Sequence, residues 1–125
     1  MLFIFRPSGV KKLPKPGKVV AKITGRRGRG LLRDGDTVRV LEILGDKIAS
    51  LNKKIILSAS KKQKTTLLER LGDIYYACFS LSSSRRSDFL QRAFDEYENA
   101  GCLEKVELIK KKISELNEGN AENKQ

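Results

Sequence analysis

The residues best suited to chemistry in this chain are basic side chains near its start. Three arginines alternate with glycines in the predicted loop Gly25-Arg26-Arg27-Gly28-Arg29-Gly30. Glycine leaves room for a close approach to phosphate groups, and arginine offers a bidentate fork to them. The candidate nucleic-acid-binding residues are Lys11, Lys12, Lys15, Lys18, Lys22, Arg26, Arg27, Arg29 and Arg33. We interpret this set as a surface that contacts RNA or DNA phosphates with little sequence readout. The alternatives are a solubilising surface or a contact with an acidic protein.

The sequence offers little for catalysis or metal binding. It contains no histidine, which removes the commonest general base and every serine–histidine or cysteine–histidine nucleophile. Cys78 and Cys102 stand apart without a CxxC motif, so we predict two free thiols packed like small hydrophobic residues. The carboxylates of Asp95, Glu96 and Glu98 cluster, but such a cluster is typical of a solvated helix face. We therefore predict no enzyme, no metal site and no cofactor.

Charge is divided unevenly along the 125 residues. Residues 1–62 hold sixteen Lys or Arg and four Asp or Glu, a net charge of +12. Residues 63–125 hold ten Lys or Arg and eleven Asp or Glu, a net charge of −1. The first half is thus predicted to bind a polyanionic partner. The apolar start stops at Arg6, too early for a signal peptide or a membrane span, so we expect a cytoplasmic protein.

The elements that position the basic residues are predicted to be short strands. Residues 18–24 alternate between apolar and other side chains, and residues 37–44 give the best strand pattern. The apolar pattern changes phase near Val40 and Leu41, which either a β-bulge or burial of both faces would explain. Gly45-Asp46 suits a hairpin turn, and residues 52–54 suit a second one. Short strands joined by tight turns imply a small, mostly antiparallel β-barrel of the OB or SH3-like type.

The second half is predicted to be helical. Thr66 and Glu69 form a capping-box pattern before an apolar run, which indicates the start of a first helix. A second helix starts at Ser87 or Asp88 and ends at Gly101. A third helix follows from residue 103 to residue 116, where apolar residues recur three or four apart.

The predicted fold class is therefore α+β, a small β-barrel followed by three α-helices. The predicted organisation is a basic barrel at residues 1–60, a helical hairpin plus a third helix at residues 61–117, and a disordered tail at residues 118–125.

Two segments of the helical half resemble a single tetratricopeptide-type hairpin. They are Leu68-x-x-Leu71-Gly72-x-x-Tyr75 and Ala93-x-x-x-Tyr97-x-x-Ala100. In that family the glycine lets two helices approach, and the small residues lie where the second helix crosses the first. The connection between the segments is about nine residues longer than in that repeat. The resemblance implies a protein-interaction adaptor that binds a protein partner through residues 66–116.

Residues 5–51 resemble the OB-like soluble domain of the NfeD family. The similarity lies in Phe5-Arg6-Pro7-Ser8-Gly9 and in Gly35-Asp36-Thr37-Val38-Arg39-Val40-Leu41-Glu42-Ile43-Leu44-Gly45-Asp46-Lys47-Ile48. That family pairs its domain with membrane segments, which this sequence lacks, and residues 35–58 fit the end of an S1-like RNA-binding barrel equally well. The leading prediction is a non-enzymatic protein whose basic barrel binds nucleic acid, with RNA preferred to DNA because small barrels of this type commonly bind RNA. The alternative is the protein-interaction adaptor.

Overall fold

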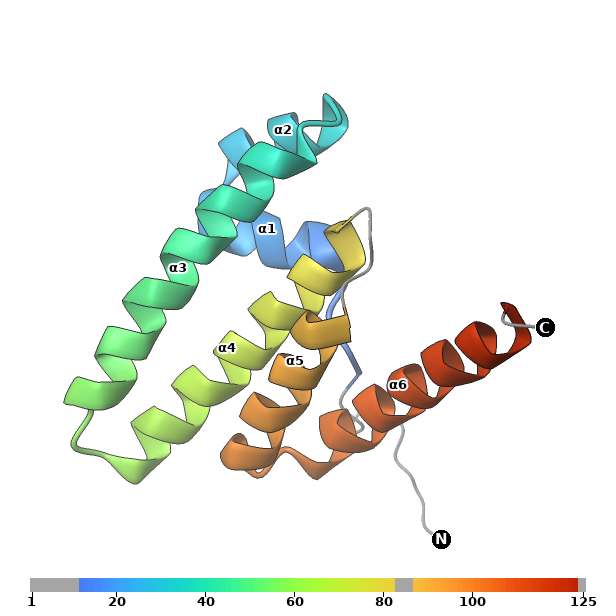
Figure 1. The fold of residues 1–125 in the computed structure, drawn as a ribbon. Coiled ribbons are helices and arrows are strands. Elements are labelled where there is room, and N and C mark those ends of the chain that lie inside the picture. The colour runs from blue at the N-terminus through green and yellow to red at the C-terminus, as the bar shows by residue number, and fades with distance from the viewer. Residues whose placement is uncertain (1–11, 83–86, 124–125) are drawn as a thin grey trace, which may run out of the picture.

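Every regular element of the computed structural model is an α-helix (Figure 1). The structure describes residues 12–82 and 87–123, and within these ranges it has six helices and no strand. The helices are α1 (Pro16–Thr24), α2 (Arg26–Arg33), α3 (Thr37–Leu57), α4 (Lys61–Leu81), α5 (Ser87–Ala100) and α6 (Leu103–Asn123). The predicted α+β fold with an N-terminal β-barrel is therefore wrong: the described part of the chain is a helical bundle.

The strongest predicted strand lies inside α3, because its apolar residues follow a helical spacing. Val40, Leu44 and Leu51 are buried at intervals of four and seven residues, as one face of an α-helix requires. The change of phase near Val40 marks the passage of that stripe from one turn to the next, so no bulge is needed. The predicted hairpin turn at Gly45 lies exposed in the middle of the helix. The OB-like barrel that the resemblance to the NfeD family implied is thus absent from residues 37–57.

Helices α1 and α2 replace the predicted strand at residues 18–24 and the basic loop that follows it. Pro16 occupies the first turn of α1, where its missing N–H has no helical partner to lose. Gly25, with a φ of 65°, makes the sharp turn between the two helices. Gly28 lets α2 lie close to α1, because a Cβ there would come within 2.7 Å of Cγ1 of Val20. The predicted flexible loop is therefore a packed helix.

The helical hairpin predicted for residues 66–100 is present as α4 and α5. Helix α4 begins before the predicted capping box, since the Ser60 hydroxyl accepts a hydrogen bond of 3.3 Å from the Gln63 N–H. Gly101, with a φ of 73°, follows the end of α5 as predicted. Helix α6 continues to Asn123, past the predicted start of the tail at residue 118.

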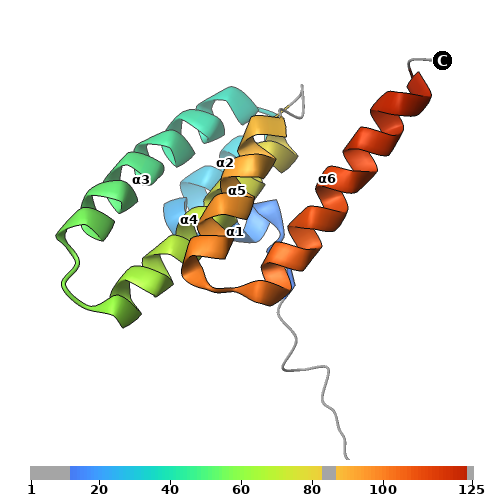
Figure 2. The same ribbon diagram turned by 60° about the horizontal axis from the view of Figure 1, so that its bottom comes forward.

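Helices α3 to α6 are stacked in chain order, each packed against the next, and α1 lies against α3 and α4 (Figures 1 and 2). One core runs through the stack; its largest fully buried side chains are Val20, Val40, Leu44, Leu51, Leu71, Leu90, Tyr97 and Ile109. Since α1 and α3 both pack on α4, the basic first half of the chain contacts the second half. A domain boundary at residue 60 stays a prediction. Among the described helices, none has the length and apolar character needed to cross a membrane.

Candidate functional site

A buried ion-pair cluster joins the start of α6 to the hairpin. The Lys105 side chain is only 8% exposed, and its Nζ lies 2.8 Å from Oε2 of Glu69 and 2.9 Å from Oδ1 of Asp73. Tyr97 of α5 donates its hydroxyl to the same Oδ1 of Asp73. The Lys105 ammonium also lies 5.2 Å from the centre of the Tyr97 ring, within the range of a cation–π contact. We call these four residues the Lys105 cluster; it ties α4, α5 and α6 together.

The Lys105 cluster stabilises the packing of α6, and Lys105 and Tyr97 both keep their protons at neutral pH. Burial by itself lowers the pKa of Lys105, but the hydrogen bonds to Glu69 and Asp73 outweigh it, so the pKa ends above its ordinary value. Burial, helped by the neighbouring Asp73, raises the pKa of the Tyr97 phenol. Lys105 therefore stays charged and Tyr97 stays a neutral donor, as a fixed ion pair requires.

The hairpin crosses tightly beside this cluster. A Cβ on Gly72 of α4 would lie 2.6 Å from Cε1 of Tyr97, so the Tyr97 ring occupies the space that a side chain would need. Ala93, which lies on α5 like Tyr97, is fully buried. The close approach of the two helices at Gly72 is therefore a contact between the glycine backbone and the Tyr97 ring. The resemblance to a tetratricopeptide hairpin stays a prediction.

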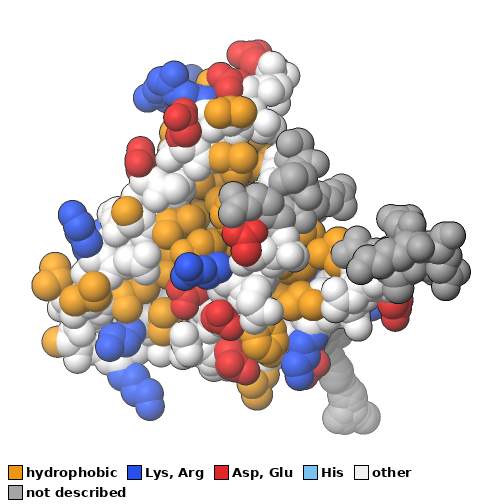
Figure 3. Space-filling model, viewed as in Figure 1, with side chains coloured by type: hydrophobic (Ala, Val, Ile, Leu, Met, Phe, Trp, Pro, Cys, Tyr) orange, Lys and Arg blue, Asp and Glu red, His pale blue; other side chains and the backbone are white. Residues whose placement is uncertain are grey.

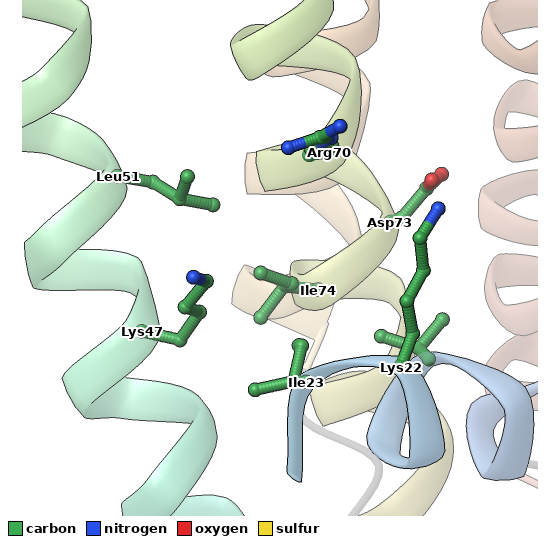
Figure 4. Close-up of a pocket in the computed structure, with 8 residues that line it drawn as sticks. Lys22, Ile23, Lys47, Leu51, Arg70, Asp73 and Ile74 are labelled. Atoms are coloured by element: carbon green, nitrogen blue, oxygen red, sulfur yellow. The ribbon is translucent and has the colours of Figure 1, made fainter. Parts of the chain in front are cut away.

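A pocket of about 210 Å³ lies between α1, α3 and α4 (Figure 4). We call it the α1–α3–α4 pocket. Its apolar lining is Val19, Ile23, Leu51 and Ile74, and its charged lining is Lys22, Lys47, Arg70 and Asp73. Figure 4 shows Leu51 and Lys47 directed from α3 toward α4, and Lys22 extending from α1 toward Asp73 of α4. On the surface, hydrophobic side chains gather in the recess between α3 and α4, with a Lys or Arg at its edge (Figure 3).

The charges of this pocket are unbalanced in favour of cations. Three helices contribute one cation each: Lys22 from α1, Lys47 from α3 and Arg70 from α4. Within residues 12–82 and 87–123, none of the three side chains forms an ion pair. The carboxylate of Asp73 already accepts from Tyr97 and Lys105. The lining of the pocket thus carries three cations and one carboxylate, whose negative charge Lys105 partly offsets.

The predicted basic residues are spread over α1 and α2. Lys11 lies outside the described residues, and the other eight are exposed. Four of them line an open groove of about 570 Å³ between α1 and α2: Lys15, Lys18, Arg29 and Arg33. Lys22 lines the α1–α3–α4 pocket, whereas Arg26 and Arg27 line neither site. The leading functional prediction, nucleic-acid binding by a basic β-barrel, is wrong because the described residues contain no barrel.

Sequence reasoning missed Lys47 and Arg70 as site residues. Both stand four residues before an apolar residue of the pocket, Leu51 for Lys47 and Ile74 for Arg70. On a helix that spacing puts the two side chains of each pair on one face. The signal was present in the sequence, but at Lys47 it was hidden by the strand interpretation of residues 37–51.

A second feature is the cleft beside the latter half of α6. Burial falls along this helix, since Val106 and Ile109 are 5% and 0% exposed while Ile113 and Leu116 are only half-buried. Two pockets flank the helix there, with volumes of about 220 Å³ and 250 Å³. They are lined by Tyr76, Phe79, Ser80, Lys112, Glu115 and Leu116 on the α4 side, and by Gln91, Phe94, Lys110, Ile113, Ser114 and Asn117 on the α5 side. We call the two pockets together the α6 cleft.

The described residues hold no obvious reaction centre. No three potential metal ligands gather anywhere in the described ranges. Cys78 and Cys102 are free, as predicted, and burial raises the pKa of the Cys78 thiol to about 11. Cys78 is therefore a protonated thiol at neutral pH and a poor nucleophile. No family model, curated protein or solved structure matches this chain.

Proposed function

We propose that the protein is a non-catalytic protein-interaction module that holds an amphipathic helix of a partner protein in the α6 cleft. The observation that carries this proposal is the apolar lining on both sides of α6, most of which is only half-buried. Tyr76 and Phe79 offer stacked rings with centroids 6.3 Å apart, and Leu116 faces them from α6. Helix-in-groove recognition needs such an apolar floor, onto which the apolar face of a partner helix packs.

The polar rim of the cleft suits the same kind of partner. Lys110 and Lys112 stand beside the apolar residues, together with Glu115. Charges of both signs at the rim fix the register and orientation of a bound helix more than they add affinity. An amphipathic helix brings apolar residues for the floor and polar residues for this rim.

The Lys105 cluster supports the proposal because it fixes the base of α6. Lys105 lies at the first turn of α6, and its ion pairs with Glu69 and Asp73 hold that turn on α4. The cleft is thereby formed before a partner arrives. A preformed cleft saves the ordering free energy that a mobile helix would lose on binding.

The non-catalytic part of the proposal is supported by chemistry. The sequence has no histidine, and the polar groups of the Lys105 cluster are satisfied by one another. The free thiols of Cys78 and Cys102 are compatible with a reducing compartment, so we also propose a cytoplasmic location.

Site-specific photo-crosslinking in cells tests the proposal. A photoreactive amino acid at Leu116 should give one adduct of defined mass with a partner protein, and the same amino acid at Lys53 of α3 should not. Lys53 is exposed and lies on another helix, outside the cleft, so it serves as the matched control. Identical adducts from both positions, or no protein adduct from Leu116, would contradict the proposal.

A further inference from the structure

We propose that the α1–α3–α4 pocket is a second binding site, which takes a carboxylate side chain and its apolar neighbour from an acidic segment of a partner protein. This site lies apart from the α6 cleft and shares no lining residue with it. The proposal therefore goes beyond the function proposed above and is tested without reference to that cleft.

The cations account for the carboxylate. Lys22, Lys47 and Arg70 line the pocket from three helices, and none of them forms an ion pair within the described ranges. The guanidinium of Arg70 can donate two N–H hydrogen bonds to the two oxygens of a carboxylate, and the ammonium groups of Lys22 and Lys47 add positive charge to the pocket. Asp73 offsets only part of this attraction, because Lys105 and Tyr97 both donate to its Oδ1.

The apolar lining of the pocket explains why the partner segment should carry an apolar residue next to its carboxylate residue. Ile23, Leu51 and Ile74 form a wall that an aliphatic side chain would cover. A free phosphate ion would leave that wall in water and gain only the charges. At about 210 Å³ the pocket is smaller than the ~300–1,000 Å³ typical of sites for drug-sized molecules and cofactors. One or two side chains of a peptide fit this size better.

A path for the rest of the segment leads along α1. Lys15 is the N-cap residue of α1, and Lys18 and Lys22 lie four residues apart on one stripe of that helix. Lys15 and Lys18 line the open groove between α1 and α2, and Lys22 lines the pocket. From Lys15 to Lys22 the helix rises about 10 Å, the length of about three extended residues. A short acidic segment can therefore reach both sites.

The composition of this face favours an acidic protein over a nucleic acid. Residues 12–74 contain no Phe, Tyr or Trp, so α1, α2 and α3 offer no ring on which a base could stack. Single-stranded nucleic acids are usually held by such stacking together with phosphate contacts. An acidic peptide needs no stacking, and its aliphatic side chains match the wall of the pocket.

Fluorescence anisotropy with the full chain tests the proposal. The probe is a short labelled peptide that repeats the unit Glu-Glu-Leu-Gly, compared with a serine-for-leucine peptide and an oligouridylate of equal charge, at about 50 mM salt, where phosphate contacts are strong. The pocket variant Lys47→Gln/Arg70→Gln is matched by Lys53→Gln/Lys54→Gln, which loses the same charge at exposed positions outside the pocket. Thermal melts verify that both variants fold.

We expect the leucine peptide to bind most tightly of the three probes. The pocket variant should raise its Kd about tenfold and the control variant less than about twofold, as the loss of two partly exposed charge contacts implies. Leu116→Asp in the α6 cleft should leave this Kd unchanged, which separates the two proposals. Equal weakening by the pocket and control variants would overturn the proposal. So would equal binding of the serine peptide, tighter binding of the oligouridylate, or no binding of the leucine peptide.

Discussion

Replacing Lys105 with methionine tests whether the buried ion pairs hold α6 on the hairpin. Methionine keeps a long unbranched side chain and removes only the ammonium group, so packing is nearly preserved. The carboxylates of Glu69 and Asp73 would then remain on neighbouring turns of α4 without the cation that lies 2.8 Å and 2.9 Å from them. The variant thus removes a cation from beside two partly buried carboxylates.

The expected cost follows from how deeply the three charges are buried. Removal of one partner from a buried ion pair costs about 3–5 kcal/mol. The Lys105 side chain is 8% exposed, but Glu69 and Asp73 are each 25% exposed and keep part of their hydration. We therefore expect the lower end, a loss of about 3 kcal/mol in the free energy of unfolding. Against a typical stability of about 5–15 kcal/mol, such a loss is easily measured.

Urea unfolding at pH 7, followed by circular dichroism, provides the measurement. The matched control is Lys110→Met, because the Lys110 ammonium lies 3.8 Å from Glu107 and both side chains are more than half exposed. The control should change the free energy of unfolding by less than about 0.5 kcal/mol. A Lys105→Met variant that is no less stable than Lys110→Met would refute the reasoning.

The pH dependence of stability adds a second readout for Lys105. The pKa of Lys105 is raised in the folded protein, so its contribution is fully present below the unfolded value of about 10.4. That contribution is lost as the pH rises through the higher folded value. Wild type should therefore lose more stability above about pH 10.4 than Lys105→Met does. The raised pKa of Tyr97 acts in the same direction but is present in both proteins.

Three further predictions concern the helices and the core. Gly72→Ala should destabilise by about 1–3 kcal/mol, because its Cβ would meet the Tyr97 ring at 2.6 Å, whereas Gly45→Ala, with open space around it, should stabilise by about 0.5–1 kcal/mol. Asp36→Ala should cost about 1 kcal/mol, since the Asp36 carboxylate accepts from the Arg39 N–H at 3.2 Å at the start of α3. Stability should fall between pH 9 and about 11, because the pKa of Cys78 is raised from 9.0 to about 11 in the folded state, and Cys78→Ala should flatten this fall. Urea titrations of each variant, at pH 7 or across that alkaline range, measure all three.

The outcomes that would contradict these predictions differ. A destabilised Gly45→Ala variant would favour the hairpin turn over a continuous α3. A harmless Gly72→Ala variant would show that the Tyr97 ring can move aside. An Asp36→Ala variant as stable as wild type would show that the Asp36 cap does not stabilise α3. An unchanged alkaline fall in Cys78→Ala would assign it to other groups.

The second half of the chain was predictable because its local signals agree. The apolar stripe of α4 and the glycine after α5 both indicate a helical hairpin, and no competing period is present. The first half misled because α3 is rich in β-branched residues such as Val38, Val40 and Ile43, which favour strands. The Gly45-Asp46 pair strengthened that error, since the same pair is common in tight turns. Burial on α4 and α1 overrides these local preferences and holds α3 as a helix.

The site was harder to predict than the fold, because its members are distant in sequence. Lys22, Lys47 and Arg70 meet only after α1, α3 and α4 pack together. Their spacing carries no motif, and a charge count of the first half cannot say which cations converge. The uneven charge therefore pointed to an anionic partner while leaving its binding site open.

Asp73 connects the two features that the sequence left undefined. Its carboxylate belongs to the Lys105 cluster and also lines the α1–α3–α4 pocket. Because the Lys105 ammonium contacts Oδ1 of Asp73, this carboxylate repels an incoming anion less than a lone aspartate would. The ion pair that secures α6 thus also sets the potential of the pocket. Lys105→Met should therefore weaken binding of the acidic peptide even though Lys105 does not line the pocket. Unchanged peptide binding by a folded Lys105→Met protein would show that the cluster and the pocket act independently.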